Sequence, residues 1–341
     1  MDTADFDYEL PDAAIAQSAL PQRHASRVLV GSDLSEVPFL AIDSLLCRGD
    51  LLVVNTTRVR AARLLGVRVP TGGTCELLLT KHLEGSRWQA LAKGSKRLRA
   101  GSVVQCGTIT ATVVTDPRGG VVTVDLATDG DMEDAIEREG VIPLPPYFHG
   151  SLSSQERYQT MFATHVGSSA SPTAALHFTP EVLLRIEEKG VEMSSVELQV
   201  GLDTFRPMGD GEVEDHQIHS ERIVIGLDVV EAIRRCRERA GRVIAVGTTV
   251  VRALESAGQT ATLDAGHIGE YVGETDLFIS PGYRFGVVDG LFTNFHAPRT
   301  TLLVMIASIV GERWRDIYAH ALAKDFRFLS FGDAMYVEVD R

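Results

Sequence analysis

Two histidines that stand three residues apart, with acidic neighbours, form the first group in this sequence that could carry chemistry. The segment DHQIHSER contains Asp215, His216, His219 and Glu221. Imidazoles beside carboxylates are suited to general acid–base catalysis near neutral pH, and on a helix the two rings would share one face. Ordinary structural histidines and a metal-dependent hydrolase are the alternatives. We expect no bound metal, because no third His or Cys stands at the usual spacing of a zinc site.

Two further segments place a histidine shortly before an expected helix. SPTAALHFTPE carries Ala175 and His177, and LFTNFHAPRTTLL carries Asn294, Phe295 and His296. Small side chains such as that of Ala175 let the backbone approach a flat ligand closely. A lone histidine is more often structural than catalytic, so neither segment is specific by itself.

A glycine-containing turn between a strand and a helix is a candidate anion site. The segment RVIAVGTTVVRALES predicts a buried strand, a tight turn at Gly247 and a helix capped by Thr248 or Thr249. The free N–H groups of the first helical turn can bind a carboxylate or a phosphate, although such a junction also occurs without a ligand. The segment SPGYRF pairs Tyr283 with Arg284, a combination that stacks on nucleobases but is equally common in cores.

Positive charge is concentrated in one short block of an acidic chain. The formal net charge is −13, yet residues 56–100 carry ten basic and two acidic side chains. A basic block on an acidic protein favours local contact with phosphates, and a solvated strand face is the alternative.

The two ends of the chain predict alternating helices and strands that would position these segments. Helices are expected at 11–20, 39–47, 180–189, 228–240, 249–257, 301–310 and 312–323, and strands at 27–31, 50–55, 196–200 and 242–246. The run DLLVVN is continuously apolar, as in a strand buried on both faces of a sheet.

The middle of the chain has a different pattern. Short β-branched runs at 76–80, 88–92, 102–106, 109–114 and 121–126 are separated by turn residues, which is typical of a small barrel or sandwich. The sequence therefore predicts a discontinuous α/β domain, 1–59 and 150–341, with an inserted all-β, barrel-like domain at 60–149. The proline-rich segment PLPPY would link the two.

Composition sets the class of protein. The chain has 341 residues, 44% of them hydrophobic and 23% charged, as in a globular protein with a sizeable core. Its longest apolar stretch, 302–310, is far shorter than the ~20 residues of a membrane span. Four scattered cysteines without a CxxC pair, and an acidic N-terminus, favour a cytoplasmic enzyme. We expect a monomer that does not contact membranes.

Many segments together resemble one known family, the S-adenosylmethionine:tRNA ribosyltransferase-isomerases (the QueA family). The resemblance covers almost the whole chain, in the same order. The segments that carry it are FDYELPDAAIAQ, GDLLVVNTTRVRAARLLG, PLPPY, RYQTMFA, PTAALHFT, VGLDTFRP, DHQIHSE, GRVIAVGTTVVRALES, TDLFISPGYRF, VDGLFTNFHAPRTTLL and FRFLSFGDAM.

The resemblance implies a fold and a reaction. The fold is an α/β domain with an inserted β-barrel. The reaction transfers and isomerises the ribosyl group of S-adenosylmethionine onto 7-aminomethyl-7-deazaguanine at the wobble position of a tRNA anticodon, which yields epoxyqueuosine, adenine and methionine. S-adenosylmethionine is a co-substrate, and tRNA is the partner.

The reaction needs a base that removes the acidic ribose C5′ proton, an acid that helps adenine to leave, and a pocket for charged ligands. The resulting candidates for catalysis are His177, His216, His219 and His296, with Asp215 and Glu221 orienting an imidazole or lying near the sulfonium. The candidates for substrate binding are Gly247, Thr248, Thr249, Arg252, Ala175, Asn294, Phe295, Tyr283 and Arg284. The candidates for tRNA binding are Arg58, Arg60, Arg63, Lys93, Lys96, Arg97 and Arg99.

Four positions depart from the family's usual pattern. Thr56 stands where an Asp is usual, Ala175 where a Gly is usual, and Gln199 and Asp203 replace a His and a Gly. These changes leave two alternatives: a related transferase that acts on a non-tRNA amine or a 7-deazaguanine, and a tRNA-binding relative without catalysis.

Overall fold

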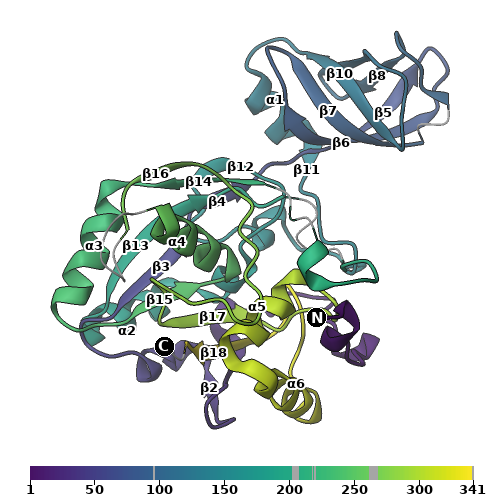
Figure 1. Cartoon of the computed structure of the whole chain (residues 1–341). Helices are drawn as coiled ribbons and strands as arrows, with labels where there is room; N and C mark the ends of the chain where they lie inside the picture. Colours follow the sequence, from purple (N-terminus) through teal and green to yellow (C-terminus); the bar gives the residue numbers. More distant parts are fainter. Residues whose placement is uncertain (95–96, 202–206, 217, 219, 261–267, 340–341) are drawn as a thin grey trace. The chain divides into compact units, whose positions relative to one another are not determined.

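The computed structural model describes residues 1–94, 97–201, 207–216, 218, 220–260 and 268–339. The chain forms two compact units, which Figure 1 shows in sequence colours. One unit combines Met1–Arg58 with Pro145–Arg341, and the other is the continuous segment Val59–Leu144. The expected insertion, 60–149, also included the end of PLPPY, but Pro145 and Tyr147 belong to the larger unit.

A nine-stranded sheet forms the centre of the larger unit. Its order is β16-β14-β13-β3-β15-β17-β18-β1-β2. The four central strands run parallel: β13 (Glu192–Leu198), β3 (Leu51–Asn55), β15 (Val243–Val246) and β17 (Gly290–Asn294). The outer strands are β14 (Glu221–Ile225), β16 (Tyr271–Thr275), β18 (Ala334–Glu338), β1 (Arg27–Val30) and β2 (Glu36–Pro38). Two short strands, β4 (Thr57–Val59) and β12 (His165–Ser168), pair with each other.

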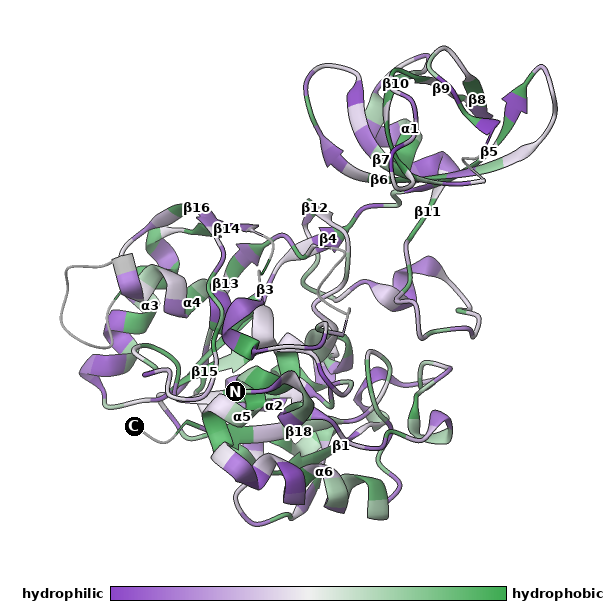
Figure 2. Ribbon diagram, turned by 45° about the vertical axis from the view of Figure 1, so that its right-hand side comes forward, coloured by the Kyte–Doolittle hydropathy of each residue, from purple (hydrophilic) through white to green (hydrophobic). Residues whose placement is uncertain are grey.

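Helices cover both faces of this sheet, so its central strands are buried on both sides. In β3, Leu51 and Val53 pack into one core, while Leu52 and Val54 pack into the opposite one. The first core is closed by α3 (Leu227–Glu238), α4 (Thr248–Thr260), α5 (Thr301–Val310) and α6 (Trp314–Ala323). The second is closed by α2 (Pro180–Lys189) and the 3₁₀ helices 39–45 and 173–177. Figure 2 shows the hydrophobic strands between these helices.

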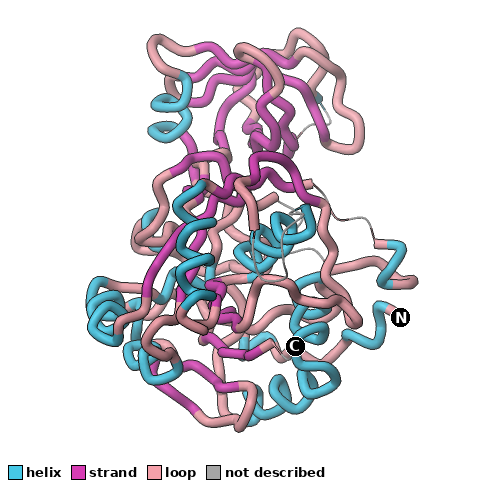
Figure 3. The backbone as a smooth tube through the Cα atoms, turned by 60° about the vertical axis from the view of Figure 1, so that its left-hand side comes forward, coloured by secondary structure: helices cyan, strands magenta, loops and turns pink. Residues whose placement is uncertain are grey.

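The smaller unit is a closed antiparallel barrel. Its strands are β5 (Arg63–Val69), β6 (Thr74–His82), β7 (Arg87–Lys93), β10 (Val121–Ala127), β9 (Ile109–Val113) and β8 (Val103–Cys106), and β8 pairs with β5 to close the ring. The short strand β11 (Gly140–Val141) adds to β5, and α1 (Met132–Glu139) packs against the barrel core through Ala135 and Ile136. The strands are drawn in magenta in Figure 3.

Several expected elements differ from the structure. The helix expected at 11–20 is only a 3₁₀ turn at Asp12–Ala14, and that at 39–47 is a 3₁₀ helix, Phe39–Leu45, interrupted at Ala41. No element was expected at β5 or α1, and no strand was expected at β2, β14, β16, β17 or β18 of the larger sheet. In the part of the chain that the structure describes, no helix is long and apolar enough to cross a membrane.

Candidate active site

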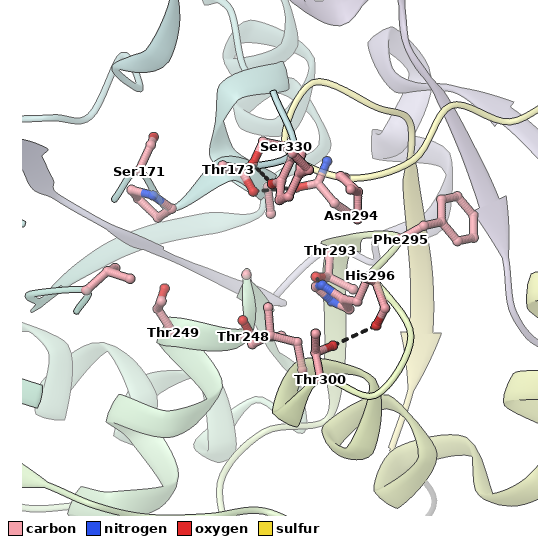
Figure 4. Close-up of a pocket in the computed structure, with 18 residues that line it drawn as sticks. Ser171, Thr173, Thr248, Thr249, Thr293, Asn294, Phe295, His296, Thr300 and Ser330 are labelled. Carbon is pink, nitrogen blue, oxygen red and sulfur yellow. Dashed lines mark hydrogen bonds between the residues drawn. The ribbon is translucent and has the colours of Figure 1, made fainter. Parts of the chain in front are cut away.

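A hollow opens where the parallel strands β15 and β17 end (Figure 4). It contains about 600 Å³, including space open to solvent. The lining consists of segments 171–174, 247–249, 293–297 and 329–330, together with Tyr147, Val200, Thr300 and Leu302. Ligands of α/β sheets commonly bind at the carboxyl ends of the strands, so this is the natural position for a substrate.

The turn after β15 places the start of α4 at this hollow. Gly247 has φ +92°, a conformation that favours glycine, and its N–H donates to Phe292 O at 2.8 Å. Thr248 and Thr249 then begin α4 and line the hollow, as expected from the sequence. Because the first amides of a helix have no partner within it, this end of α4 is suited to a carboxylate.

The turn after β17 places the start of a second helix there. Thr300 caps α5 by accepting a hydrogen bond from Leu303 N at 3.4 Å, and its hydroxyl donates to Ala297 O at 2.8 Å. Thr300 and Leu302 line the same hollow as Thr248 and Thr249. The positive ends of two helix dipoles therefore lie around one space.

Asn55 at the end of β3 joins the strands and α4, and the sequence analysis missed it. Its side chain is fully buried, and Oδ1 accepts from Leu198 N at 3.2 Å and Thr57 N at 3.1 Å. Its Nδ2 donates to Leu198 O at 3.0 Å and to Thr249 Oγ1 at 3.3 Å. A polar residue that ends an apolar strand was the available signal. Asn55 positions Thr249 without lining the hollow itself.

His177 lies behind the hollow and reaches it through Asn294. The Nδ1 atom of His177 lies 2.8 Å from Ser26 Oγ, and Nε2 lies 3.2 Å from Asn294 Nδ2. Since an amide nitrogen donates, Nε2 accepts and Nδ1 carries the proton. Thr173 Oγ1 donates to Asn294 Oδ1 at 2.8 Å, which fixes the amide orientation. Burial, together with the charges of Arg23 and Arg327, lowers the pKa of His177 to about 4.

His296 lines the hollow directly. Its Nε2 lies 3.0 Å from Thr293 Oγ1, and its backbone is held by the hydroxyls of Tyr318 and Tyr8. Burial lowers the pKa of His296 to about 3. The imidazole is consequently neutral at pH 7, and it can accept a proton or a hydrogen bond but does not supply a stored proton.

Hydroxyl groups, rather than charges, dominate the lining. Among the described lining residues there is no Asp, Glu, Lys or Arg. Ser171 is buried at the wall, and its Oγ has no hydrogen-bond partner in the described part of the protein. The sequence analysis missed Ser171, Thr173, Thr293 and Thr300, which stand beside the singled-out histidines and asparagine. An unpartnered buried hydroxyl at the wall is available to a polar ligand.

The acidic candidates lie elsewhere. Glu221 in β14 is buried and forms an ion pair with Arg252 of α4, and its Oε1 accepts from Gly201 N at 2.8 Å. The Arg252 side chain also donates to Leu277 O at 3.1 Å. Neither residue lines the hollow. Their contacts with each other and with the backbone are those of a buried ion pair that stabilises the fold.

The DHQIHSER segment is not helical where it is described. A 3₁₀ turn, Val213–Asp215, ends at His216, whose backbone angles are extended. The His216 ring packs edge-on to the Phe278 ring, with 6.0 Å between the ring centroids. Asp215 is exposed, and neither it nor His216 lines the hollow. His219 lies outside the described residues. The helix expected here is therefore not present at His216.

The remaining substrate-binding candidates divide between lining and support. Asn294 and Phe295 line the hollow. Ala175 is fully buried in the core beneath it, so its methyl group packs against apolar neighbours. Tyr283 donates to Glu255 at 3.2 Å, Arg284 is exposed, and neither lines the hollow.

The basic block is partly neutralised by nearby carboxylates. In the larger unit Arg58 pairs with Glu156 at 2.5 Å. In the barrel unit Arg60 makes two 3.0 Å hydrogen bonds to Glu133.

The other members of the block differ in exposure. Arg63 lies 3.5 Å from Glu76. Lys93, Arg97 and Arg99 are exposed, and Lys96 lies outside the described residues. The exposed cations of this group therefore belong to the barrel unit.

The four departures from the family pattern do not line the hollow as far as they are described. Thr56 hydrogen-bonds Val196 O at 3.3 Å, and Gln199 donates to Glu197 at 2.9 Å. Ala175 belongs to the core, and Asp203 lies outside the described residues. Thr56, Ala175 and Gln199 are therefore not lining residues of the hollow.

Comparisons with known proteins agree with this fold. The sequence model of the family described as "Queuosine biosynthesis protein" matches residues 3–337. The S-adenosylmethionine:tRNA ribosyltransferase-isomerase of Pelotomaculum thermopropionicum is 44% identical and covers 99% of this chain and 100% of its own length.

A solved structure gives the same result. The crystal structure of S-adenosylmethionine tRNA ribosyltransferase from Thermotoga maritima is similar with a TM-score of 0.55 at 31% identity, over 97% of this chain and 99% of that one. The expected α/β fold with an inserted barrel is confirmed. The chain belongs to the queuosine biosynthesis family of S-adenosylmethionine:tRNA ribosyltransferase-isomerases.

Proposed function

We propose that this protein transfers and isomerises the ribosyl group of S-adenosylmethionine onto a tRNA, and that the hollow at the carboxyl ends of β15 and β17 binds S-adenosylmethionine. The observation that carries the reaction is the end-to-end match to a 44%-identical relative whose name states it. No observation favours a different acceptor, since the departures from the family pattern lie outside the described lining.

The lining supports this choice of ligand. The methionine carboxylate fits the amide-rich starts of α4 and α5, where Thr248 and Thr300 stand. The ribose hydroxyls fit Ser171 and its neighbours, because Ser171 Oγ otherwise lacks a partner among the described residues. Val200 and Leu329 offer apolar contact to the adenine ring.

The described lining contains no carboxylate that would stabilise the sulfonium cation. Removing the C5′ proton turns the sulfonium into a neutral ylide and, when His296 takes the proton, moves the positive charge to the imidazole. The total charge of the site is unchanged, so the step is favoured by the absence of a carboxylate beside the sulfonium and not by desolvation.

His296 is the residue that we assign to proton transfer. It is neutral at pH 7, and it lines the hollow. When Nε2 donates to Thr293 Oγ1, Nδ1 is left to accept the C5′ proton. Because the pKa is low, the resulting imidazolium is a strong acid and passes the proton on to the departing adenine. His177 and Asn294 act as positioning residues for the wall.

The acceptor amine then attacks the ribosyl unit, and methionine leaves. The acceptor in this proposal is 7-aminomethyl-7-deazaguanine in the tRNA anticodon, and the product is epoxyqueuosine. Lys93, Arg97 and Arg99 of the barrel unit are exposed cations that can contact RNA phosphates.

The test is a direct product analysis. The protein is incubated with S-adenosylmethionine and a tRNA that carries the 7-aminomethyl base, and free adenine and the mass of the RNA are measured by chromatography and mass spectrometry. We expect adenine release matched by a mass gain in the RNA. The same tRNA with an unmodified guanine is the control and should give neither. Release of adenine without any change in the RNA would contradict the tRNA acceptor.

A further inference from the structure

A second, smaller hollow adjoins the first one in the larger unit. It contains about 290 Å³, including space open to solvent, and Arg23, Arg157 and His177 are among its lining residues. Ser330 lines both hollows and is itself buried. A group bound in the second hollow would therefore lie next to a substrate in the first.

The wall between the two hollows is a hydrogen-bonded pair. His177, which lines the second hollow, accepts from Asn294 Nδ2 at 3.2 Å, and Asn294 lines the first. The two spaces are thus parts of one region of the protein rather than separate surface features.

The two arginines of the second hollow are held by backbone carbonyls. Arg23 donates to Leu176 O at 3.2 Å and to Glu156 O at 2.8 Å, and Arg157 donates to Leu20 O. Neither arginine forms an ion pair with any carboxylate in the described chain. Burial and the charge of Arg157 lower the pKa of Arg23, which indicates that the two guanidinium groups repel each other.

Neighbouring carboxylates offset this charge only in part: Glu156 acts on Arg23, and Asp333 acts on Arg327. The Glu156 carboxylate is paired with Arg58, and Asp333 lies 3.6 Å from Arg27. The positive charge of Arg327 contributes to the lowered pKa of His177. Its Nη1 atom is buried and has no hydrogen-bond partner among the described residues. These guanidinium groups are half-buried and lack an ion-paired carboxylate among the described residues, so a bound anion would stabilise them.

We propose that the second hollow is an oxyanion subsite, and that it takes a phosphodiester group of the RNA acceptor. Planar guanidinium groups match phosphate oxygens well. The carboxylate of S-adenosylmethionine is the other available oxyanion, but the two helix N-termini of the first hollow already suit it. This inference rests on the proposed function, because it takes RNA as the acceptor.

The test measures RNA binding without turnover. Wild type and Arg157→Gln are titrated with an anticodon-arm RNA hairpin at salt concentrations from about 50 to 200 mM. We expect Arg157→Gln to weaken binding roughly tenfold at the lowest salt and to reduce the salt slope by about one. Arg157→Lys keeps the charge and should retain the slope. Arg234→Gln, which removes an equal charge from α3, is the matched control and should bind as wild type does.

The possible results separate the claims. If the wild type binds the hairpin and Arg157→Gln binds it equally well, the subsite is refuted while the proposed function stands. If Arg157→Gln instead weakens the calorimetric binding of S-adenosylmethionine and leaves RNA binding intact, the assignment to RNA is overturned. If the wild type does not bind the hairpin, both this inference and the tRNA acceptor fail. Thermal melting of Arg157→Gln and Arg157→Lys shows whether lost binding reflects unfolding.

Discussion

The substitution Gly247→Ala tests whether the turn after β15 positions the S-adenosylmethionine site. Gly247 has φ +92°, which costs an L-residue about 1–2 kcal/mol. A Cβ would meet only Ala174 at 3.6 Å and Thr249 at 3.7 Å, so the cost comes from the backbone and not from a clash. The turn relaxes by moving the first amides of α4. We expect the KM for S-adenosylmethionine to rise about tenfold or more, since small misplacements of binding groups are costly.

Gly49 supplies a control with the same strain. Gly49 has φ +95°, and an added Cβ would come no closer than 3.5 Å to the Arg239 side chain. It precedes β3, so it lies at the amino end of this strand, whereas the hollow lies at the carboxyl ends of the parallel strands. Gly49→Ala should lower the free energy of unfolding by a similar ~1–2 kcal/mol and leave the KM unchanged. The assays are urea unfolding and initial rates of adenine release. Equal KM values for the two variants would refute the reasoning.

Three further outcomes follow from the buried polar groups. Asn55→Leu leaves Leu198 and Thr57 backbone groups unpaired and should cost roughly 2–4 kcal/mol of unfolding free energy in urea; a cost below about 1 kcal/mol would contradict this role. Arg252→Met leaves the buried Glu221 carboxylate without its ion-pair partner and should lower the free energy of unfolding by about 3–5 kcal/mol. Adding Glu221→Gln should restore part of this loss, and additive losses would contradict the pairing. Lowering the pH from 7 to 5 should reduce the free energy of unfolding by roughly 2 kcal/mol for each of His177 and His296, because these imidazoles bind a proton in the unfolded chain but not when buried. His296→Gln should remove about half of this pH dependence. An unchanged dependence would contradict a buried, neutral His296.

Local patterns predicted the longer helices and four strands of the nine-stranded sheet, namely β1, β3, β13 and β15. DLLVVN and RVIAV are apolar throughout, because both faces of the sheet are covered. α2 has Pro at its first turn and Gly190 in a left-handed C-cap, so its bounds could be predicted from sequence. α5 likewise begins after Thr300, as expected.

The failures have a physical cause in tertiary context. The segment 11–20 has helical apolar spacing, but beyond its 3₁₀ turn the chain is held by hydrogen bonds to Phe328, so little of it is helical. α1 was missed because it is short and largely polar, with only Ala135 and Ile136 buried.

The site was predictable only in part. Gly247, Thr248 and Thr249 follow a strand that the sequence predicts, and ligands commonly bind at that end of such a strand. Asn294 ends β17 and His296 follows it, but no strand was expected there, so their meeting with Thr248 was not predicted. Glu221 and Arg252 are far apart in sequence, and nothing local indicates that they pair with each other. Charge counting could not show that Arg58 and Arg60 have carboxylate partners, because those partners, Glu156 and Glu133, are distant along the chain.

The measurement that tests the central claim most directly is a calorimetric titration with S-adenosylmethionine. Ala297 lines the hollow, and Ala297→Phe would occupy space that the ligand needs. Leu184→Phe on the exposed side of α2 is the matched control. We predict saturable binding to the wild type and to the control, and a loss of at least tenfold in affinity for Ala297→Phe. Undiminished binding to a folded Ala297→Phe would contradict the placement of S-adenosylmethionine at the carboxyl ends of β15 and β17.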